Sequence, residues 1–330
     1  MRYIIAFDGG GTKSHYCIFD LTGKLVYNKI VGGSNHQSLG INHTKTVLSK
    51  LFEESLQDLD LFPDQIAFAY LGISGADLES DYVKLNDICE DVFHDIPFKV
   101  VNDAWLVLRS GLKTPYGAVA ISGTGTNSAA INRQGQRAIL RSLGFTLGIY
   151  GGGLDIAREG LHYAFRADEL TGENTILQQK IPQLLGVGEM NDVVDLFYPT
   201  MKIDRIKFGE ITKLVFECAE SNDKISISIL ERIGNILGLQ TGGVIRQLNM
   251  QTEEVPVVIG GSVFQNESRI LVSAFTNCIH KVCPKAEVIK PKYKPVVGAF
   301  LFGLDELQLN QSEFVEQNLE ESGLSYGQRN

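Results

Sequence analysis

The chain has 330 residues, a formal net charge of -9 and a pI near 5.3. Its hydrophobic content of 44% and charged content of 21% are ordinary for a globular protein, and its length predicts about two domains. The acidic balance argues against nucleic-acid partners, which need a basic face, but it leaves nucleotides open.

Strand-like and helix-like segments alternate along the first third of the chain. Apolar runs of strand length occur at 3–7, 14–19, 25–30, 66–73 and 98–101. Segments with helical spacing occur at 44–59, 82–93 and 104–111. This order predicts an α/β protein with strands in mixed directions.

A second strand–glycine–strand segment begins near Tyr116. Gly9, Gly11, Thr12 and Ser14 match Gly123, Gly125, Thr126 and Ser128 at one constant offset. This weak internal repeat predicts domains at 1–115 and 116–330, the second with a helical insertion at about 170–225.

The rest of the second part alternates helices with two short strands. Helices are expected at 154–167, 175–185, 192–198, 204–220, 224–248, 269–282 and 296–309. Strands are expected at 255–261 and 286–289. The residues from Gln311 onward are polar, and we expect them to be loosely held.

Five cysteines without a C-x-x-C pair predict free thiols in a reducing compartment. The N-terminus reaches Asp8 after a few apolar residues, which is unlike a signal peptide, and no apolar run has the length of a membrane span. We therefore expect a cytoplasmic protein that does not contact membranes.

The two glycine turns are candidate phosphate sites. The P-loop pattern fails because Thr12 separates Gly11 from Lys13, and the dinucleotide fingerprint fails because a strand follows the glycines. Backbone N–H groups in such turns can form an anion nest, with hydroxyls from Thr12, Thr124 or Thr126 as further donors. The alternative is a pair of tight hairpins.

Two aspartates stand at strand ends. Asp8 precedes the first glycine turn, where a carboxylate suits magnesium directly or through water. Asp103 ends a buried strand and begins a helix, so it is either an N-cap or a general base for a hydroxyl that attacks a phosphoryl group. Both roles are compatible in geometry.

Further glycine turns end apolar strands at Ser74-Gly75 and at Gly260-Gly261. The second would let an adenine ring lie against bare backbone, or it is an ordinary strand-to-helix turn. Asn35 is a loop residue that is only a weak ligand candidate by itself.

These motifs together resemble the sugar kinase/Hsp70/actin superfamily, and within it the family of N-acetylglucosamine kinase and the BadF/BadG/BcrA/BcrD-type ATPases. "AFDGGGTKS" is similar to the first phosphate motif, "AISGTGTN" to the second, "VVNDA" to the segment of the catalytic aspartate and "VIGGSVF" to the adenosine motif. "GGGLDIAREGL" and "KPVVGAFLFG" resemble helices of that family, and the matches run in order over nearly the whole chain.

The resemblance implies two ribonuclease-H-like domains of the actin-like ATPase fold, with ATP and sugar in an interdomain cleft. It implies Asp103 as general base and Asp8 near Mg²⁺. The nucleotide would be held by Gly10, Gly11, Thr12, Gly123, Thr124, Gly125, Gly260 and Gly261. The sugar would contact Asn35, Ser74, Asp103, Thr126, Asn127 and Gly144. Relatives are often dimers, which makes a homodimer an expected assembly.

One segment departs from the family pattern. "SLGFTLGIYGGG" places Leu143 at a tryptophan position and Ile149-Tyr150 at an Asp-Glu pair whose aspartate normally binds sugar hydroxyls. Isoleucine cannot accept those hydrogen bonds, and sites built on such bonds discriminate strongly between substrates. We therefore expect an altered, more apolar sugar, such as N-acetylmuramic acid or a glycoside.

The leading prediction is an ATP-dependent kinase of an amino sugar such as N-acetylglucosamine or N-acetylmuramic acid. The alternatives are a regulator that binds nucleotide or sugar without catalysis and an ATPase coupled to a partner. An activator of radical dehydratases is disfavoured, because no cysteine lies between Cys89 and Cys218 to hold an iron–sulfur cluster.

Overall fold

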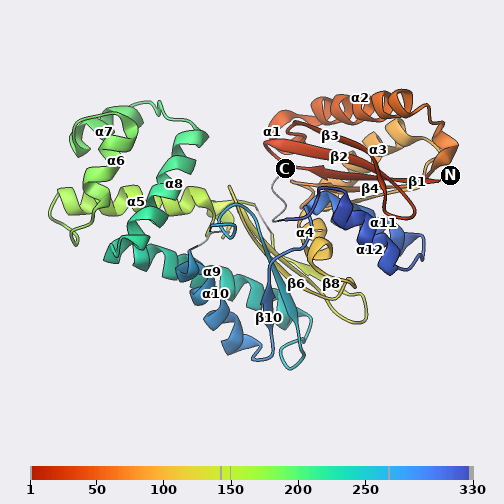
Figure 1. Cartoon of the computed structure of the whole chain (residues 1–330). Helices are drawn as coiled ribbons and strands as arrows, with labels where there is room; N and C mark the ends of the chain where they lie inside the picture. Colours follow the sequence, from red (N-terminus) through yellow and green to blue (C-terminus); the bar gives the residue numbers. More distant parts are fainter. Residues whose placement is uncertain (1, 142, 149, 267, 327–330) are drawn as a thin grey trace. The chain divides into compact units, whose positions relative to one another are not determined.

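The computed structural model describes residues 2–141, 143–148, 150–266 and 268–326. The chain forms two compact units, one of 1–119 with 289–330 and one of 120–288. Each unit contains a five-stranded sheet with helices (Figure 1). The predicted second domain, 116–330, included 289–330, which here belongs to the first unit. The assignment of 1–115 and 116–330 as two actin-like domains, with a helical insertion at about 170–225, stays a prediction.

The first unit is built on a mixed sheet of order β3-β2-β1-β4-β5. Its strands are β1 (Tyr3–Gly9), β2 (Lys13–Asp20), β3 (Leu25–Gly32), β4 (Ile66–Ile73) and β5 (Phe98–Val101). Its helices are α1 (His36–Leu39), α2 (Ile41–Leu59), α3 (Glu79–Phe93), α4 (Ala104–Gly111), α11 (Pro295–Glu306) and α12 (Glu313–Glu321). β1 pairs antiparallel with β2 and parallel with β4, which pairs parallel with β5. The predicted mixed directions are therefore confirmed.

Alternate side chains of β1 pack into two different apolar clusters, one on each face of the sheet. Ile5 and Phe7 lie in one apolar cluster with buried residues of α2 and α3. On the other face, β1 contacts α11, where Gly303 lies against Ile4. Because side chains of a strand alternate between faces, the buried apolar run Ile4–Phe7 of β1 requires helices on both sides of the sheet.

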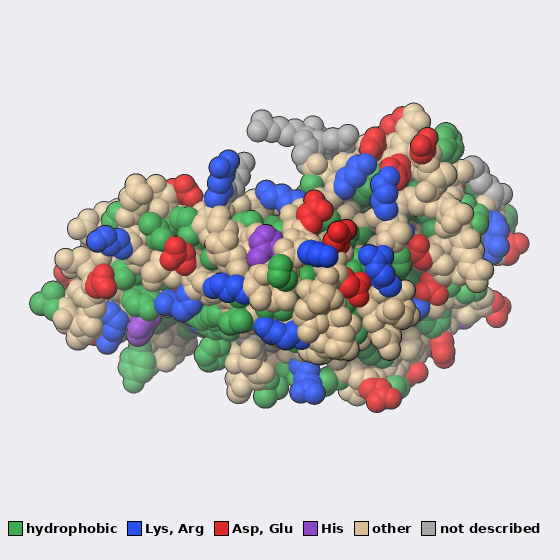
Figure 2. All heavy atoms as spheres, turned by 90° about the horizontal axis from the view of Figure 1, so that it is seen from below, with side chains coloured by type: hydrophobic (Ala, Val, Ile, Leu, Met, Phe, Trp, Pro, Cys, Tyr) green, Lys and Arg blue, Asp and Glu red, His purple; other side chains and the backbone are tan. Residues whose placement is uncertain are grey.

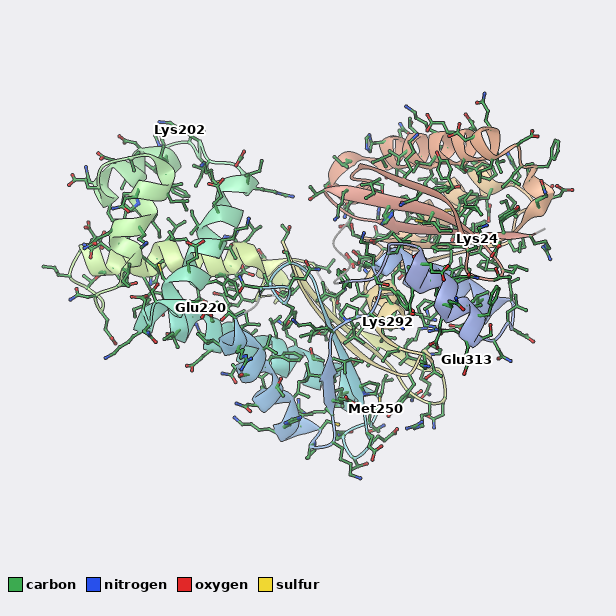
Figure 3. All side chains as sticks on the ribbon, viewed as in Figure 1. Lys24, Lys202, Glu220, Met250, Lys292 and Glu313 are labelled. Atoms are coloured by element: carbon green, nitrogen blue, oxygen red, sulfur yellow. The ribbon has the colours of Figure 1, made fainter. Side chains whose placement is uncertain are left out.

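The C-terminal segment is more ordered than the sequence predicted. Residues Glu313–Glu321 form α12, in which Val315 and Leu319 are buried. The Asn318 side chain donates to the backbone oxygen of Thr22 in the β2–β3 turn, at 2.8 Å. Figure 3 labels Lys24 in that turn and Glu313 at the start of the helix. The expectation of a loosely held segment from Gln311 is therefore wrong for α12.

The second unit has a sheet of order β10-β9-β6-β7-β8. Its strands are β6 (Gly117–Ser122), which enters from the first unit, β7 (Thr126–Ile131), β8 (Arg137–Ile139), β9 (Pro256–Gly260) and β10 (Glu287–Ile289). Its helices are α5 (Gly153–Asp168), α6 (Leu177–Leu185), α7 (Met190–Phe197), α8 (Arg205–Glu220), α9 (Lys224–Gln247) and α10 (Arg269–Val282). Helices α5 to α8 pack on one another, and α9 contacts β7. Each predicted helix of this part exists, with ends within a few residues.

A stripe of glycines brings α9 and α10 close together. Gly234, Gly238 and Gly242 recur every four residues on α9. A Cβ on Gly238 would lie 2.5 Å from Cys278 Cβ, and one on Gly242 would lie 2.9 Å from Val282 Cγ2. The bare backbone of α9 is therefore part of this helix contact. Met250, labelled in Figure 3, stands in the turn that leads from α9 to β9.

The surface carries charges of both signs. The face in Figure 2 shows separate basic and acidic side chains with uncharged surface between them. Among the described residues, none of the helices combines the length and apolar character that crossing a bilayer demands.

Candidate functional site

Three parallel strands of the first unit end at one edge of the sheet. Asp8 of β1 is in register with Gly72 of β4, and Gly72 is in register with Val101 of β5. Asn102 and Asp103 follow Val101 directly. The two predicted acidic residues, Asp8 and Asp103, thus lie at the same carboxyl edge, where open α/β sheets place their ligands.

The first glycine turn lies at this edge and is held by its neighbours. Ser74 N–H donates to Gly9 O at 2.7 Å, and Ser34 N–H donates to Gly10 O at 3.0 Å. A Cβ on Gly33 would overlap with Gly11 O, so a glycine is required there for the close approach. Gly11 and Thr12 are exposed to solvent, where a ligand can reach them.

Asn35 and Ser74, two predicted sugar contacts, are brought together. Asn35 Nδ2 donates to Ser74 Oγ at 3.1 Å. Asn35 Oδ1 caps α1 by accepting from the N–H groups of Gln37 and Ser38. The sequence described Asn35 as a weak candidate in a loop, whereas the structure gives it a defined orientation beside the first glycine turn.

The carboxylate of Asp103 is not used as a helix cap. Asp103 precedes α4, yet within the described residues its side chain makes no capping hydrogen bond. Asn102 Oδ1 accepts from the Ala104 N–H instead, at 3.0 Å. Of the two roles that the sequence left open for Asp103, the structure therefore gives the capping hydrogen bond to Asn102.

The environment of this edge makes its carboxylates harder to ionise. Burial raises the pKa of Asp103 from 3.8 to about 7, with smaller contributions from the charges of Asp8 and Asp77, which the N–H groups of Ala104 and Asp103 itself oppose. Burial also raises the pKa of Asp8 to about 6, partly offset by Lys13. A base is most effective when its pKa lies near the working pH, so these values suit proton transfer near neutrality.

The second glycine turn lies in the second unit, between β6 and β7. Gly153 N–H donates to Gly123 O at 2.7 Å, and a Cβ on Gly152 would lie 2.7 Å from Thr124 O. Gly125 is exposed, and among the described residues no atom lies within 4 Å of a Cβ built on it. As in the first turn, a neighbouring glycine segment supports the backbone while the tip stays open.

The predicted adenosine turn adjoins the second glycine turn. Gly261 has φ +91°, and its Cβ position would overlap with Ser122 O, so both conformation and space require glycine. Val263 N–H donates to Ser122 O at 2.9 Å. Gly123–Gly125 and Gly260-Gly261 are therefore neighbours in the second unit. Thr126 and Asn127 follow the turn as buried residues of β7.

The loop with the unusual sequence is anchored at its end. Tyr150 donates its hydroxyl to Glu159, which also pairs with Arg232. Gln240 Nε2 donates to Tyr150 O at 2.9 Å. Gly144, a predicted sugar contact, is exposed with φ +82° and precedes a 3₁₀ turn. Ile149, the predicted specificity position, lies outside the described residues.

The sequence did not indicate three polar residues that support these turns. Asp155 Oδ2 accepts from the N–H groups of Gly151 and Gly152, at 3.0 and 3.1 Å. Asn102 Nδ2 donates to Asp77 Oδ1 at 2.9 Å. A usable signal existed only for Asp155, which stands at the third position of a helix, where a carboxylate reaches back to free N–H groups.

Comparison with known proteins decides the family. The profile of the BadF/BadG/BcrA/BcrD ATPase family matches residues 7–303. The chain belongs to this ATPase family. The match spans both glycine turns, Asp103 and most of α11, and it confirms the family that the motifs predicted.

Two relatives of this ATPase match more than nine tenths of the chain. A Clostridium acetobutylicum protein named N-acetylmuramic acid/N-acetylglucosamine kinase is 28% identical over 93% of this chain and 99% of its own. A Dictyostelium discoideum protein named N-acetyl-D-glucosamine kinase is 29% identical over 91% of this chain and 97% of its own.

A solved structure confirms the predicted fold class. A candidate N-acetylglucosamine kinase from Chromobacterium violaceum has a TM-score of 0.67 and 20% identity, over 92% of this chain and 99% of that one. The fold is thus the two-sheet α/β architecture of the actin-like ATPases.

Proposed function

We propose that this ATPase phosphorylates a hydroxyl of an amino sugar, N-acetylglucosamine or N-acetylmuramic acid. The observation that supports this proposal most strongly is the position of Asp103. Its side chain does not cap α4, and it lies at the edge of the sheet where Asp8 and the first glycine turn also lie. The two relatives named as kinases of these sugars support the same substrate class.

The two glycine turns fit a nucleotide. Each turn has an exposed tip and a backbone packed so closely that a Cβ on Gly33 or Gly152 would meet a carbonyl oxygen. Exposed backbone of this kind forms anion nests for phosphate. We assign phosphate contacts to Gly10, Gly11 and Thr12 in one unit and Gly123, Thr124 and Gly125 in the other. The turn at Gly260 and Gly261 would receive adenosine.

The acidic residues fit magnesium held in part by the nucleotide. Among the described residues, no group of three or more His, Cys, Asp or Glu side chains is arranged to hold a metal ion. Magnesium typically uses one or two carboxylates and takes its other ligands from water and phosphate. Asp8 alone therefore suffices as the protein's contribution, and a nearby cation would favour its ionised form.

The residues of this chain act mainly by positioning. ATP with magnesium supplies the phosphoryl group and offsets its charge. Asn35, Ser74, Thr126, Asn127 and Gly144 would orient the sugar. Asp103 accepts the proton of the attacking hydroxyl, and its raised pKa suits that proton transfer at neutral pH.

ADP release across a panel of sugars tests this proposal. The panel contains N-acetylglucosamine, N-acetylmuramic acid, glucosamine, N-acetylmannosamine, glucose and a blank without sugar. Stimulation by one of the two N-acetylated sugars named above is the expected result. Equal turnover with and without sugar would instead identify a partner-coupled ATPase. ATP binding without turnover would identify a regulator.

A second variant tests the sequence departure. If Ile149 favours a more apolar sugar, Ile149→Asp will shift the ratio of kcat/KM between N-acetylmuramic acid and N-acetylglucosamine towards the latter. An unchanged ratio would remove this position from the account of specificity.

A further inference from the structure

Asn102 caps helix α4. The position of Asp103 directly before this helix would suggest the aspartate for that role. The Asn102 side chain is 2% exposed, and its Oδ1 accepts from the Ala104 N–H at 3.0 Å. The first N–H groups of a helix lack partners within the helix, so a side-chain oxygen is needed there. With Asn102 in this role, the Asp103 side chain is not the cap of α4, although the Ala104 N–H still favours its charged form.

Asp77 determines which way the Asn102 carboxamide points. Asn102 Nδ2 donates to Asp77 Oδ1 at 2.9 Å and to Ala76 O at 3.4 Å. A carboxamide turned by half a rotation would place its NH₂ group against the Ala104 N–H and its oxygen against the Asp77 carboxylate. Both contacts would be repulsive, so Asp77 fixes the orientation that caps α4.

The segment that carries Asp77 also touches the predicted sugar contacts. It begins at Ser74, which accepts from Asn35 Nδ2 at 3.1 Å. Asp81 Oδ2 fixes the end of the segment by accepting from Leu78 N–H at 3.0 Å. The segment from Ser74 to Asp77 therefore connects Asn35 with Asn102, the residue that directly precedes Asp103.

We propose that Asn102 and Asp77 are positioning residues for Asp103: Asn102 caps α4 in its place, and Asp77 holds Asn102 in the capping orientation. The proposal rests on the proposed function, because it assigns a purpose to the Asp103 carboxylate. The effect of these two residues is to fix the backbone from which Asp103 presents its base.

The kinetic arm compares four variants with the parent protein. Asn102→Ala removes the cap and the bond to Asp77, and Asp77→Ala removes that bond together with the Asp77 charge. Asp77→Asn keeps an acceptor for Asn102 Nδ2. Asp87→Asn removes an exposed carboxylate of α3 in the same unit and serves as control.

We expect Asn102→Ala to lower kcat by about 10²-fold, the cost of a small misplacement of a reacting group, with the KM for ATP nearly unchanged. Asp77→Ala should lower kcat less, whereas Asp77→Asn and Asp87→Asn should stay near the parent. Added to Asp103→Asn, Asn102→Ala should cost no further turnover. Parental kcat in Asn102→Ala, or equal losses in kcat and ATP affinity, would overturn the positioning role.

A stability arm, measured as Tm without ligands, decides the capping assignment independently of activity. Asn102→Ala should lower the Tm by about 2–4 °C, as expected for a lost cap, and Asn102→Ser should restore part of it. Asp103→Ala should not lower the Tm. The reverse pattern would overturn the proposal.

The two proposals fail in different ways. A parent protein that releases no ADP with any sugar overturns the proposed function and the positioning role with it. The other outcome overturns the inference alone. In it, sugar stimulates the parent protein, but Asp103→Ala lowers the Tm as the loss of a helix cap would. If Asn102→Ala does not fold, the kinetic and the Tm measurements are made on Asn102→Ser and Asp77→Ala instead.

Discussion

At the scale of single residues, Asp103 illustrates how burial raises the pKa of a carboxyl group. An ordinary aspartate is ionised well below neutrality, but burial and the neighbouring charges of Asp8 and Asp77 raise the pKa of this carboxyl to about 7. Lost hydration and negative neighbours both penalise the charged form. The same features that suit Asp103 for proton transfer make its ionised form unfavourable for folding.

Replacing Asp103 by Asn should separate binding from chemistry. We expect Asp103→Asn to lower sugar-stimulated turnover by about 10²–10⁴-fold, the usual contribution of a general base. ATP binding, measured by calorimetry, should remain within a few-fold of the parent because the glycine turns are intact. Turnover near the parent value would rule Asp103 out as base.

The same variant should be more stable than the parent above pH 7. The folded pKa of Asp103 is raised from 3.8 to about 7, so the folded state holds its proton more tightly than the unfolded state. The stability linked to this proton is present below pH 3.8 and is lost as the pH rises to about 7. We therefore expect Asp103→Asn to raise the Tm at pH 8 by about 2–6 °C, and to raise it less at pH 4. A lower Tm at pH 8 would contradict the assigned pKa.

Two adjacent glycines offer a matched test of the first turn. In Gly33→Ala the new methyl group would overlap with Gly11 O, so the turn must shift and ATP binding should weaken by at least about tenfold. In Gly32→Ala, among the described residues no atom lies within 4 Å of the new methyl group, and binding should be unchanged. Equal dissociation constants for ATP in both variants would exclude this turn from the nucleotide site.

The sequence pointed to candidate site residues more readily than to the residues that support them. Asp8, Asp103 and both glycine turns stand at ends of apolar strands, where a pattern along the chain is visible. The bond between Asp77 and Asn102 joins positions 25 residues apart, and no local pattern reports such a pair. The sequence offered the cap of α4 as one of two roles for Asp103, and the local pattern did not choose between Asp103 and Asn102, because Asn and Asp are both preferred N-caps.

At the scale of elements, periodicity predicted most helices and strands because their apolar faces are regular. The predicted helix at 224–248 corresponds to α9, Lys224–Gln247. The exception is α12, which buries only Val315 and Leu319, too few apolar positions to stand out. Its position is determined by tertiary contacts, among them Asn318 with the β2–β3 turn.

The glycine stripe of α9 predicts opposite effects of one substitution at two positions. Gly238→Ala would place a methyl group 2.5 Å from Cys278 Cβ and force α10 away, so the Tm should fall. Gly243→Ala lies on the same helix with no described atom within 4 Å, and it should raise the Tm slightly through better helix propensity. Thermal unfolding of both variants checks this, and an unchanged Tm in Gly238→Ala would contradict the close helix contact.

At the scale of the whole molecule, the chain returns to its first unit at the end. α11 contacts α4 and β1, and a Cβ on Gly298 would overlap with Leu106 O. Arg109, 1% exposed, forms an ion pair with Asp305 at 2.8 Å. The internal repeat indicated where a second unit begins, but the order of residues alone carries no signal that the last segment packs on the first sheet.

The burial of every cysteine gives a further prediction for the intact protein. All five cysteines are free and buried, and burial raises the pKa of the Cys89 thiol to about 12. Thiolates are the reactive form, so these thiols should be inert in the folded state. A colorimetric thiol reagent should label none of them before unfolding and all five in denaturant. Rapid labelling of the native protein would contradict the packing around at least one of them.

The central claim is phosphoryl transfer from ATP to a sugar hydroxyl with Asp103 as base. Its most direct test is mass spectrometry of the products formed from magnesium-ATP with N-acetylglucosamine or N-acetylmuramic acid, by the parent and by Asp103→Asn. The parent should form one phosphosugar for each ADP released, and the variant should form almost none. ADP accompanied by free phosphate, with no phosphosugar from either substrate, would contradict the claim.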